Sequence, residues 1–449
     1  MKISTLTASL LATTLVTSAF AVENIEVGAS AKLWYQTNTT NKDGSADLFE
    51  QPTAVALMEA DLGVKADLFE GLKGETNVVI LDSLGLENDV VGNLSNATTG
   101  HQEGDEDILK TQWWVSTANL KYNTGNTDVQ AGRMTLNTPL LFTEKWNAGY
   151  NTFEGGVVTN TDVSGVKLTA MYITGHNGTG LDGAGVPGNG IKIPSTVMYN
   201  GNFYGFGSSI DSSVDTATGL PNPKGPMYTN TVVTDGKKSL YSVGAEINPM
   251  DDLNINLWYY NISSVKDAYW ADASYKIAGV FIGAQNSGMS GKDTTTAYGK
   301  TGDNMITAFK LGYTMDKLNF FGAYSFTDDK ENAPVITNMS TNRKSKIYTQ
   351  AIVQDGGIIG AADTKAWKVQ ASYKFETWKL VGFVQNTQND SLVVGESPFA
   401  DSTEYDLVAS TKIGKHVNLK GIYMHREYDD QGSGNDAFDF VRLIASVNF

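Results

Sequence analysis

The sequence predicts an all-β protein, a transmembrane antiparallel β-barrel of about 18 strands with one connection folded into the lumen as a constriction loop. Three observations predict this fold class. Segments of about ten residues alternate apolar and polar side chains, short turns alternate with long polar connections, and the last strand ends in an aromatic residue at the carboxyl terminus.

The composition excludes several other classes of protein. The chain has 449 residues and no cysteine, and its 33 Lys and Arg face 49 Asp and Glu, for a net charge of −16. Without cysteine there is no disulfide scaffold, no thiolate nucleophile and no cysteine-ligated metal. A nucleic-acid binder would need a basic face, which the acidic balance argues against. Beyond residue 21 no apolar run approaches the ~18 residues of a transmembrane helix.

Residues 1–21 have the features of a secretory signal peptide. Lys2 supplies the positive charge, residues 6–17 form a short apolar stretch, and Ala19-Phe20-Ala21 is a small-x-small cleavage site. We therefore expect cleavage after Ala21 and a single barrel domain at residues 22–449. The absence of cysteine from so large an exported chain favours the bacterial envelope.

The alternation of side chains is clear in the first expected strand. Its apolar face holds Ile25, Val27, Ala29, Ala31, Leu33 and Tyr35, and its polar face holds Glu26, Ser30, Lys32 and Gln36. The same pattern returns at 253–259, 318–326 and 405–413. A period of two residues gives each strand one dry and one wet face, as a strand between lipid and water requires.

The connections between these segments alternate in length. Short turns are expected at 69–72, 123–126, 162–165, 249–252, 315–317, 375–377 and 414–416, and longer polar connections at 83–107, 175–239, 288–303, 328–363, 388–403 and 429–436. Outer-membrane barrels have short periplasmic turns and long external loops. An even number of strands would place both termini on the periplasmic side.

Aromatic residues cluster in pairs on or near the expected strand ends. They are Trp34-Tyr35, Trp113-Trp114, Trp258-Tyr259-Tyr260, Tyr269-Trp270 and Phe320-Phe321. Such rings favour the headgroup level of a membrane, so the pairs fit interfacial girdles. The alternative is that they are ordinary aromatic residues of a β core.

The last strand carries the most specific single feature. Val441, Leu443, Ala445, Val447 and terminal Phe449 share one face. This resembles the carboxyl-terminal signature that the outer-membrane barrel assembly machinery recognises, so Phe449 is expected to be an assembly signal and that machinery a partner. The alternative is an edge strand that happens to end in Phe.

A closer resemblance lies in residues 131–174. The pieces Gly-Arg-Met at 132–134, Thr-Pro-Leu at 138–140 and Asn-Thr-Phe-Glu-Gly-Gly-Val-Val-Thr-Asn at 151–160, together with Lys-Leu-Trp-Tyr-Gln-Thr at 32–37, resemble the major outer-membrane porins of Campylobacter and the related OprD-like porins. The resemblance implies an 18-stranded, homotrimeric porin in a Gram-negative outer membrane. It does not fix the solute.

The same segment suggests a constriction. A connection of about 17 residues, too long for a tight hairpin, separates Arg133 from Glu154 and contains Glu144 and Lys145. If the connection folds into the lumen, Arg133, Glu144, Lys145 and Glu154 would line the narrowest point and select solutes by size and charge. The alternative is a loop splayed outward with solvated charges.

Other charges are assigned to the lumen wall by strand parity, because a charge facing lipid at the midplane costs ~2–4 kcal/mol. They are Glu26, Lys32, Glu59, Asp61, Lys65, Glu75, Glu246, Lys310, Lys420, Arg426 and Arg442. Arg133, Lys420, Arg426 and Arg442 could form part of a basic ladder, but a solvated, salt-bridged wall is the preferred interpretation.

No catalytic constellation is found. The four histidines, His101, His176, His416 and His425, do not neighbour a serine and an acid in a recognisable motif, and no G-x-S-x-G, H-E-x-x-H or P-loop occurs. No catalytic residue and no cofactor are expected. The acidic run at 103–107 could hold Ca²⁺, but a solvated acidic loop, or one bridged by divalent ions to lipopolysaccharide, is favoured.

The expected function is therefore a water-filled passive channel for ions and small hydrophilic solutes, embedded among outer-membrane lipid and lipopolysaccharide. The net charge predicts weak cation selectivity. One alternative is a phospholipase-like barrel enzyme, which would need a Ser–His pair on the lipid face. Another is a surface adhesin or structural anchor that uses residues 175–239.

Overall fold

The computed structural model describes residues 22–41, 44–82, 112–178, 203, 205–206, 209–210, 232–233, 238–292, 301–352, 356–389, 401–428 and 437–449. The predicted signal peptide, most of 175–239 and the acidic run at 103–107 lie outside these residues.

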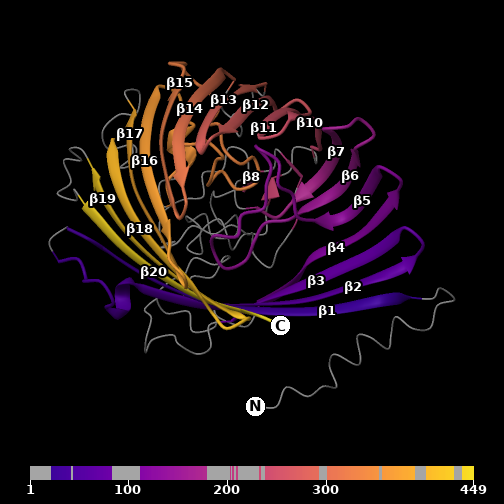
Figure 1. Cartoon of the computed structure of the whole chain (residues 1–449), viewed down its shortest axis with the longest axis horizontal. Helices are drawn as coiled ribbons and strands as arrows, with labels where there is room; N and C mark the ends of the chain where they lie inside the picture. Colours follow the sequence, from indigo (N-terminus) through magenta and orange to yellow (C-terminus); the bar gives the residue numbers. More distant parts are fainter. Residues whose placement is uncertain are drawn as a thin grey trace, which may run out of the picture.

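The chain forms one closed antiparallel barrel of 18 strands (Figure 1). Each strand pairs with the next, and β1 closes the barrel by pairing with both β2 and β20. The predicted fold class is confirmed. No helix of the described residues is long and apolar enough to cross a membrane.

The barrel strands of the first half are β1 (Glu23–Thr40), β2 (Ala54–Phe69), β3 (Leu72–Asp82), β4 (Gln112–Thr124), β5 (Thr127–Met134), β6 (Phe153–Asn160), β7 (Val166–His176) and β10 (Leu240–Met250). Those of the second half are β11 (Leu253–Ile262), β12 (Lys266–Ile277), β13 (Val280–Gly291), β14 (Asp303–Met315), β15 (Leu318–Thr327), β16 (Thr364–Lys374), β17 (Trp378–Asn389), β18 (Ser402–Ile413), β19 (Val417–Tyr428) and β20 (Ala437–Asn448). The short pieces β8 (Ser209–Ile210), β9 (Val232–Val233), η1 (Gln51–Thr53) and α2 (Gly356–Ile359) lie outside the barrel sheet.

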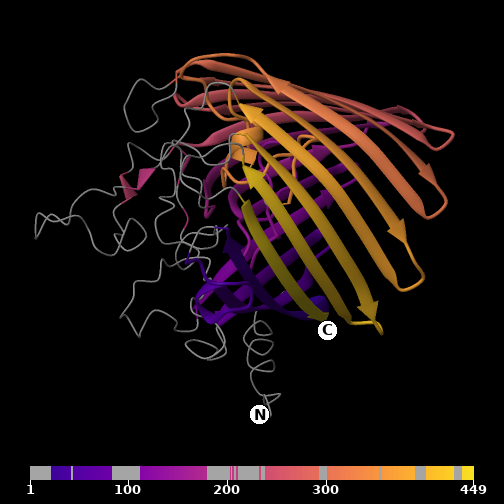
Figure 2. The same cartoon turned by 90° about the vertical axis from the view of Figure 1, so that its left-hand side faces the viewer.

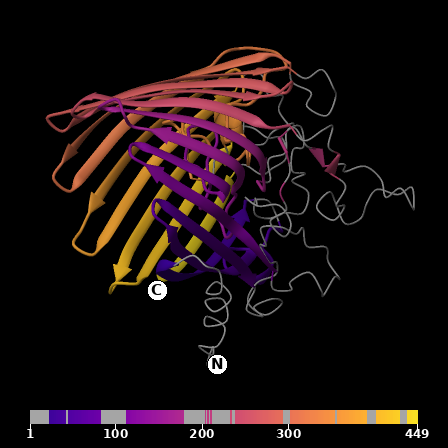
Figure 3. The ribbon, with the colours of Figure 1, turned by 90° about the vertical axis from the view of Figure 1, so that its right-hand side faces the viewer.

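The two ends of the barrel differ as predicted. We call the end with the short turns the turn rim and the opposite end the loop rim. The strands run at a steep incline between the rims, seen on the yellow and orange side in Figure 2 and on the purple side in Figure 3. Both ends of the described chain lie at the turn rim, since Glu23 pairs with Asp67 beside the β2–β3 turn and the Asn448 N–H donates to the His416 carbonyl.

The alternation of short and long connections departs from the prediction at three places. One further short turn, Ala278-Gly279, joins β12 to β13, and both residues have positive φ, as a tight hairpin requires. At the loop rim, β11 and β12 are joined by residues 263–265 alone, so one connection there is short. The connection 41–53 between β1 and β2 was not anticipated as a long one.

The side chains alternate between an outer and a lumen face. On β11, Leu257 and Tyr259 are exposed on the outside, whereas Trp258 and Tyr260 are buried inside. The Trp113-Trp114 pair divides in the same way, with exposed fractions of 65% and 4%. The aromatic groups therefore divide their rings between the outer belt and the interior, so only the outward rings fit the predicted girdle.

The upper limit of the apolar belt is marked by tyrosines near the loop rim. The Tyr259 hydroxyl donates to Asp267 at 3.0 Å, and the Tyr423 hydroxyl donates to Asp439 at 2.7 Å. Both carboxylates lie on the outer face close to the strand ends. A ring with its polar tip beside a charged group suits the lipid–water boundary.

The main apolar core lies inside the barrel, where two connections turn inward (Figure 1). Residues 135–152, between β5 and β6, form the first inner loop, and residues 333–352, between β15 and β16, form the second. Leu140 and Leu141 of the first and Ile336 and Met339 of the second pack in one cluster with Ile173 and other side chains of the wall. The predicted inward folding of the first loop is thus what the structure shows.

Candidate functional site

The first inner loop is tied to the wall through a lysine–glutamate pair. Lys32 of β1 and Glu59 of β2 lie opposite each other and form an ion pair of 2.9 Å. The Lys32 ammonium also donates to the Asn147 carbonyl at 3.2 Å, and Glu59 accepts the Gly149 N–H at 2.7 Å. Both charges of the pair therefore hold the loop backbone.

A second tie is made by Tyr150 of the same loop. Its hydroxyl donates to Asp61 of β2 at 3.0 Å and accepts from the Asn77 amide of β3 at 2.7 Å. Ser116 of β4 lies 3.1 Å from the same hydroxyl. Burial raises the pKa of Tyr150 far above its usual range, so the phenol stays protonated and remains a donor to the carboxylate.

Arg442 of β20 ties the loop to the closing strand. Its guanidinium donates to the Gln36 side chain at 2.7 and 3.0 Å and to the Trp146 carbonyl at 3.2 Å. The same group lies 4.9 Å from the ring centre of Trp34 and 5.5 Å from that of Trp146. A planar cation between two indoles is well suited to fix the loop against the wall.

The second inner loop is tied to the opposite side of the barrel (Figure 1). Gln285 of β13 donates to the Lys346 carbonyl and accepts the Tyr348 N–H, both at 3.0 Å. Lys368 of β16 donates to the Gln350 carbonyl at 2.9 Å. The wall thus offers the loop both a donor and an acceptor for its backbone.

The two inner loops meet at Glu144. Its carboxylate accepts hydrogen bonds from the Asn338 amide at 2.8 Å, the Thr341 hydroxyl, the Lys344 N–H at 3.3 Å and the Trp146 indole. The Glu144 side chain is only 3% exposed. The joined loops, 135–152 and 333–352, span the lumen between opposite walls, and we call them the diaphragm.

Glu144 does not occupy the position at the constriction that the sequence predicts, whereas the position of Lys145 is compatible with it. Glu144 does not present its charge to a pore, because donors from both loops surround it. Lys145 is exposed, with its ammonium 4.8 Å from the ring centre of Tyr150. Of the two charges placed at the constriction within this loop, only Lys145 faces water.

Arg133 and Glu154 are placed on the outer face rather than at the constriction. They lie opposite each other on β5 and β6 and form an ion pair of 2.7 Å, about one-third exposed on each side. Their neighbours Met134 and Phe153 are fully buried inside, and successive strand residues point to opposite faces. The pair therefore sits at the outer edge of the loop rim.

The other predicted wall charges share the lumen parity. Glu59, Asp61 and Arg442 hold the diaphragm, and Lys65 and Lys420 are exposed to water inside the barrel. Arg426 is buried against Glu404 of β18, which neutralises it. A continuous basic ladder therefore does not form, since Arg133 is outside and Arg426 is paired, and the salt-bridged wall describes these charges better.

The second inner loop was missed as a part of the site. The sequence placed residues 328–363 among the outer connections because of their polar composition. Within the segment, however, Ile336, Met339, Ile347 and Ala351 are buried. Spaced apolar residues in a long polar connection are the signal that would have indicated an inward fold.

The diaphragm has an excess of basic side chains. Lys145, Arg343, Lys344 and Lys346 are its cationic residues, and Glu144 is its acid. The Lys346 ammonium donates to Asn137 of the first loop and lies 4.9 Å from the ring centre of Phe142. The narrowed part of the lumen thus differs in charge from the acidic chain as a whole.

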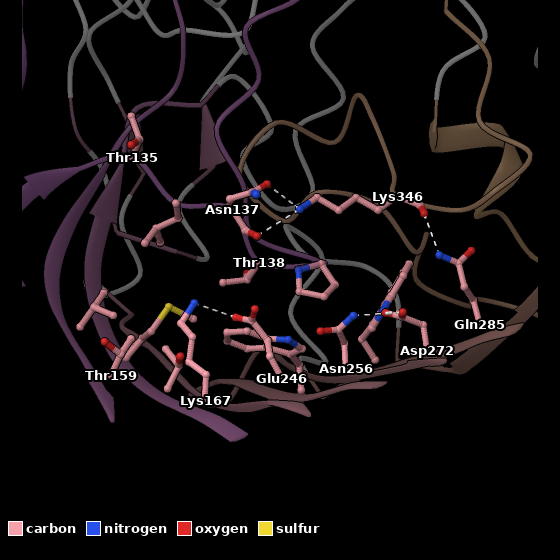
Figure 4. Close-up of a pocket in the computed structure, with 17 residues that line it drawn as sticks. Thr135, Asn137, Thr138, Thr159, Lys167, Glu246, Asn256, Asp272, Gln285 and Lys346 are labelled. Atoms are coloured by element: carbon pink, nitrogen blue, oxygen red, sulfur yellow. Dashed lines mark hydrogen bonds and ion pairs between the residues drawn. The ribbon is translucent and has the colours of Figure 1, made fainter. Parts of the chain in front are cut away.

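A cavity of about 470 Å³ lies beside the diaphragm on its turn-rim side (Figure 4). Residues 135–139 of the first inner loop and Lys346 line one side, and residues of the wall from β6 to β13 line the other. Its lining combines both signs of charge with polar and aromatic side chains.

Phe449, the expected assembly signal, and His425 both stand apart from the lumen. The Phe449 side chain is 78% exposed on the outer face, and its N–H donates to the Ala29 carbonyl at 2.8 Å. His425 lies on the outer face of β19, with Asp439 at 2.9 Å and Glu427 at 3.5 Å. These polar partners of His425 in the described chain are acids, so they supply no nucleophile.

The comparisons with known proteins concern the fold. No protein-family model and no curated sequence matches the chain. Solved structures do match over nearly the whole length of both chains. Pseudomonas aeruginosa OccK9 (OpdG) has a TM-score of 0.68 at 13% identity, covering 95% of this chain and 98% of its own. Acinetobacter baumannii OccAB4 has 0.66 at 10%, covering 96% and 100%.

A third match is Pseudomonas aeruginosa OpdK, solved with vanillate, with a TM-score of 0.64 at 13% identity, covering 95% of this chain and 98% of its own. The chain thus has the 18-stranded barrel fold of the OprD/Occ porins. These neighbours come from Pseudomonas and Acinetobacter, so they leave the closer resemblance to Campylobacter porins a prediction.

Proposed function

We propose that the chain is an OprD-like porin of the Gram-negative outer membrane, a channel through which small hydrophilic solutes diffuse passively. The observation that carries the proposal is the diaphragm, two inward loops tied to opposite walls of a closed barrel with an apolar outer belt. A barrel built only as an anchor has no need to narrow its own lumen with a hydrogen-bonded partition.

The charge of the diaphragm supports a preference for anions. The net charge of the chain had predicted weak cation selectivity. At ~0.15 M salt, however, charges act over only ~8 Å, so the groups at the narrowest segment outweigh those on distant loops. The diaphragm carries four basic side chains against one buried acid. The neighbour OpdK was solved with vanillate, a carboxylate, which is compatible with such a lumen.

Planar-bilayer recording tests both parts of the proposal. Purified protein should give discrete conductance steps, and the reversal potential in a KCl gradient should have the sign of chloride preference. A potassium-selective potential would restore the prediction from net charge while leaving the porin proposal intact. Absence of any conductance from correctly folded protein would contradict the porin proposal itself.

The partners remain proposals of the same kind. We propose a homotrimer among lipopolysaccharide, inserted by the barrel assembly machinery, on the strength of the resemblance in residues 131–174 and of Phe449. Heat-modifiable migration of the detergent-extracted protein, with a trimer band that collapses on boiling, tests the assembly. The enzyme alternative gains no support, because His425 is surrounded by acids.

A further inference from the structure

The outer face of the barrel is hollowed across the neighbouring strands β11 to β15 (Figure 1). A recess of about 720 Å³ lies there, in the apolar belt that faces the membrane, and we call it the outer recess. The outward residues of its floor are small, namely Ala273 of β12, Ala284 of β13 and Gly322 of β15. Ala273 and Ala284 lie directly opposite each other. A Cβ added at Gly322 would meet no atom within 4 Å, so the floor at that point is open space.

Large apolar side chains stand between and beside these small residues. Phe309 and Leu311 of β14 are 52% and 61% exposed. Phe309 lies opposite Ala284 on one side, and Leu311 lies opposite Gly322 on the other. Tyr324 of β15 lies opposite Phe309 and continues the border. The floor is therefore uneven, with hollows separated by the two side chains of β14.

The surface that the outer recess presents is almost entirely hydrocarbon. Ser274 and Lys310 also line it, but they alternate with outward residues and so point into the lumen. The Lys310 ammonium, for example, lies 4.2 Å from the ring centre of Tyr348 in the second inner loop. Within the described lining, the outward side chains are apolar except for the phenol hydroxyls of Tyr275 and Tyr324. Water has no partners in such a hollow, so hydrocarbon fills it.

We propose that the outer recess is a binding site for one acyl chain of a membrane phospholipid. It is continuous with the belt that the membrane covers, so a lipid chain is already its neighbour. A second copy of this barrel would present rigid strands, and Phe309 and Leu311 would stop those strands before they reached the small residues on either side. A flexible chain can bend around the same two side chains and contact the floor.

The position of the outer recess along the strands identifies the leaflet. Tyr275 and Ile282 lie opposite each other beside the Ala278-Gly279 turn, and Leu253 is the first residue of β11. The outer recess therefore occupies the half of the belt next to the turn rim. Short turns of outer-membrane barrels are periplasmic. The chain that fills it accordingly belongs to the periplasmic leaflet, which is built of phospholipid rather than lipopolysaccharide.

The strength of this binding comes from packing alone. Within a bilayer no hydrophobic force drives a chain toward protein, because the lipid tails around it are equally apolar. A chain in the outer recess gains carbon–carbon contacts with the floor and the flanking side chains that a flat belt does not offer. A handful of added contacts predicts an occupancy roughly two- to fivefold above that of the remaining belt. The proposal goes beyond the channel function and does not depend on conduction.

Photolabelling in the bilayer tests the site. The full-length protein is reconstituted into vesicles of phosphatidylethanolamine and phosphatidylglycerol with a trace of phosphatidylcholine that carries a diazirine in one acyl chain. After illumination, mass spectrometry compares the lipid attached to β12–β15 with that attached to β16–β19. Labelling of β12–β15 should be roughly two- to fivefold higher in the wild type. The double variant with Ala284→Leu and Gly322→Leu fills the floor and should lose this excess.

The matched control is Gly382→Leu on β17. Gly382 also lies on the outer belt, opposite the exposed Leu407, and its added Cβ would have its nearest neighbour at 3.8 Å. This variant should keep the excess on β12–β15, and heat-modifiable migration shows that each barrel is folded. Equal labelling of the two regions in the wild type, or an excess that survives the filled floor, would overturn the proposal.

A second measurement separates the acyl chain from a copy of the protein. The chain has no cysteine, so Gly322→Cys carries a single thiol. Oxidation in native membranes should leave this variant monomeric on a denaturing gel, as it should Gly382→Cys. A disulfide-linked pair formed by Gly322→Cys but not by Gly382→Cys would assign the outer recess to a second copy and overturn the acyl-chain site.

Discussion

The Asn338 amide donates a hydrogen bond of 2.8 Å to the Glu144 carboxylate, and this contact joins two connections that are 194 residues apart in the chain. The same carboxylate accepts from Thr341, the Lys344 N–H and the Trp146 indole. An almost fully buried acid with donors from both sides holds the two halves of the diaphragm together. The lumen is therefore shaped by a tertiary contact between loops as well as by the barrel wall.

Replacing Glu144 with Gln should loosen the diaphragm. The amide keeps one acceptor oxygen, but its NH2 group replaces the other oxygen and faces groups that themselves donate. Each lost hydrogen bond to a buried charge is worth about 1.5–3 kcal/mol. We expect single-channel records with larger and more frequent conductance fluctuations. Lys145→Gln is the matched control. Lys145 is the next residue, and its side chain is exposed, so this change should alter the current noise little. If neither variant increases the conductance fluctuations, Glu144 does not hold the two inner loops together.

The basic residues of the second inner loop should set the sign of selectivity. Replacing Arg343, Lys344 and Lys346 together with Gln removes three of the four positive charges of the diaphragm. The reversal potential in a KCl gradient should then move toward potassium, because the acidic remainder of the chain dominates. The control is Lys73→Gln, an exposed lysine at the β2–β3 turn. An unchanged potential in the triple variant would show that the narrowest segment lies elsewhere.

Lys346 should make selectivity depend on pH. Burial lowers the pKa of Lys346 to about 8, and the nearby carboxylates of Asp272 and Glu246 offset only part of that effect. The side chain is charged below this pKa and neutral above it. Raising the pH from about 7 to about 9 should therefore reduce the preference for anions. Lys346→Gln should abolish most of this change. A pH response that persists in Lys346→Gln would assign it to another group.

Strand alternation was the part of the molecule that the sequence predicted well. Leu257 and Tyr259 are outside, Lys65 and Lys420 are inside, and all follow from a period of two residues. Arg133 was wrongly assigned to the lumen, because that assignment rested on the cost of placing a charge in lipid. That cost falls to ~0–1 kcal/mol near the interface, and Glu154 compensates the charge there.

The site itself could be predicted only in part, because its decisive contacts are non-local. The length of the first inner loop indicated an inward fold, but nothing near Glu144 in the sequence identifies Asn338 as its partner. The second loop reads as polar unless the spacing of Ile336, Met339 and Ile347 is given weight. A long loop turns toward the core the side chains that fit the barrel wall it packs against. The strands of that wall are distant from the loop in the sequence.

The outer position of Glu154 leads to a negative prediction. Because Glu154 pairs with Arg133 on the outside of the β5–β6 wall, Glu154→Gln should leave the reversal potential of the channel unchanged within error. Partly exposed pairs of this kind contribute ~0–1 kcal/mol, so stability should change little too. The variant is compared with the triple change in the second inner loop, recorded under the same gradient. A shift of similar size in both would place Glu154 in the pore after all.

Removal of Phe449 should reduce assembly of the barrel in cells but leave its conductance unchanged. Its ring is 78% exposed on the outer face, and its N–H makes a single backbone bond to Ala29 at 2.8 Å, so the finished barrel depends on it little. We expect the truncated protein to reach the outer membrane in cells at a several-fold lower level. The same protein refolded from denaturant into detergent should show wild-type conductance and selectivity. The control is Val447→Ala, which trims the same outer face two residues earlier and keeps the terminal aromatic. Normal outer-membrane levels of the truncated protein would remove Phe449 as an assembly signal, and a loss of conductance after refolding would show that the residue instead stabilises the barrel.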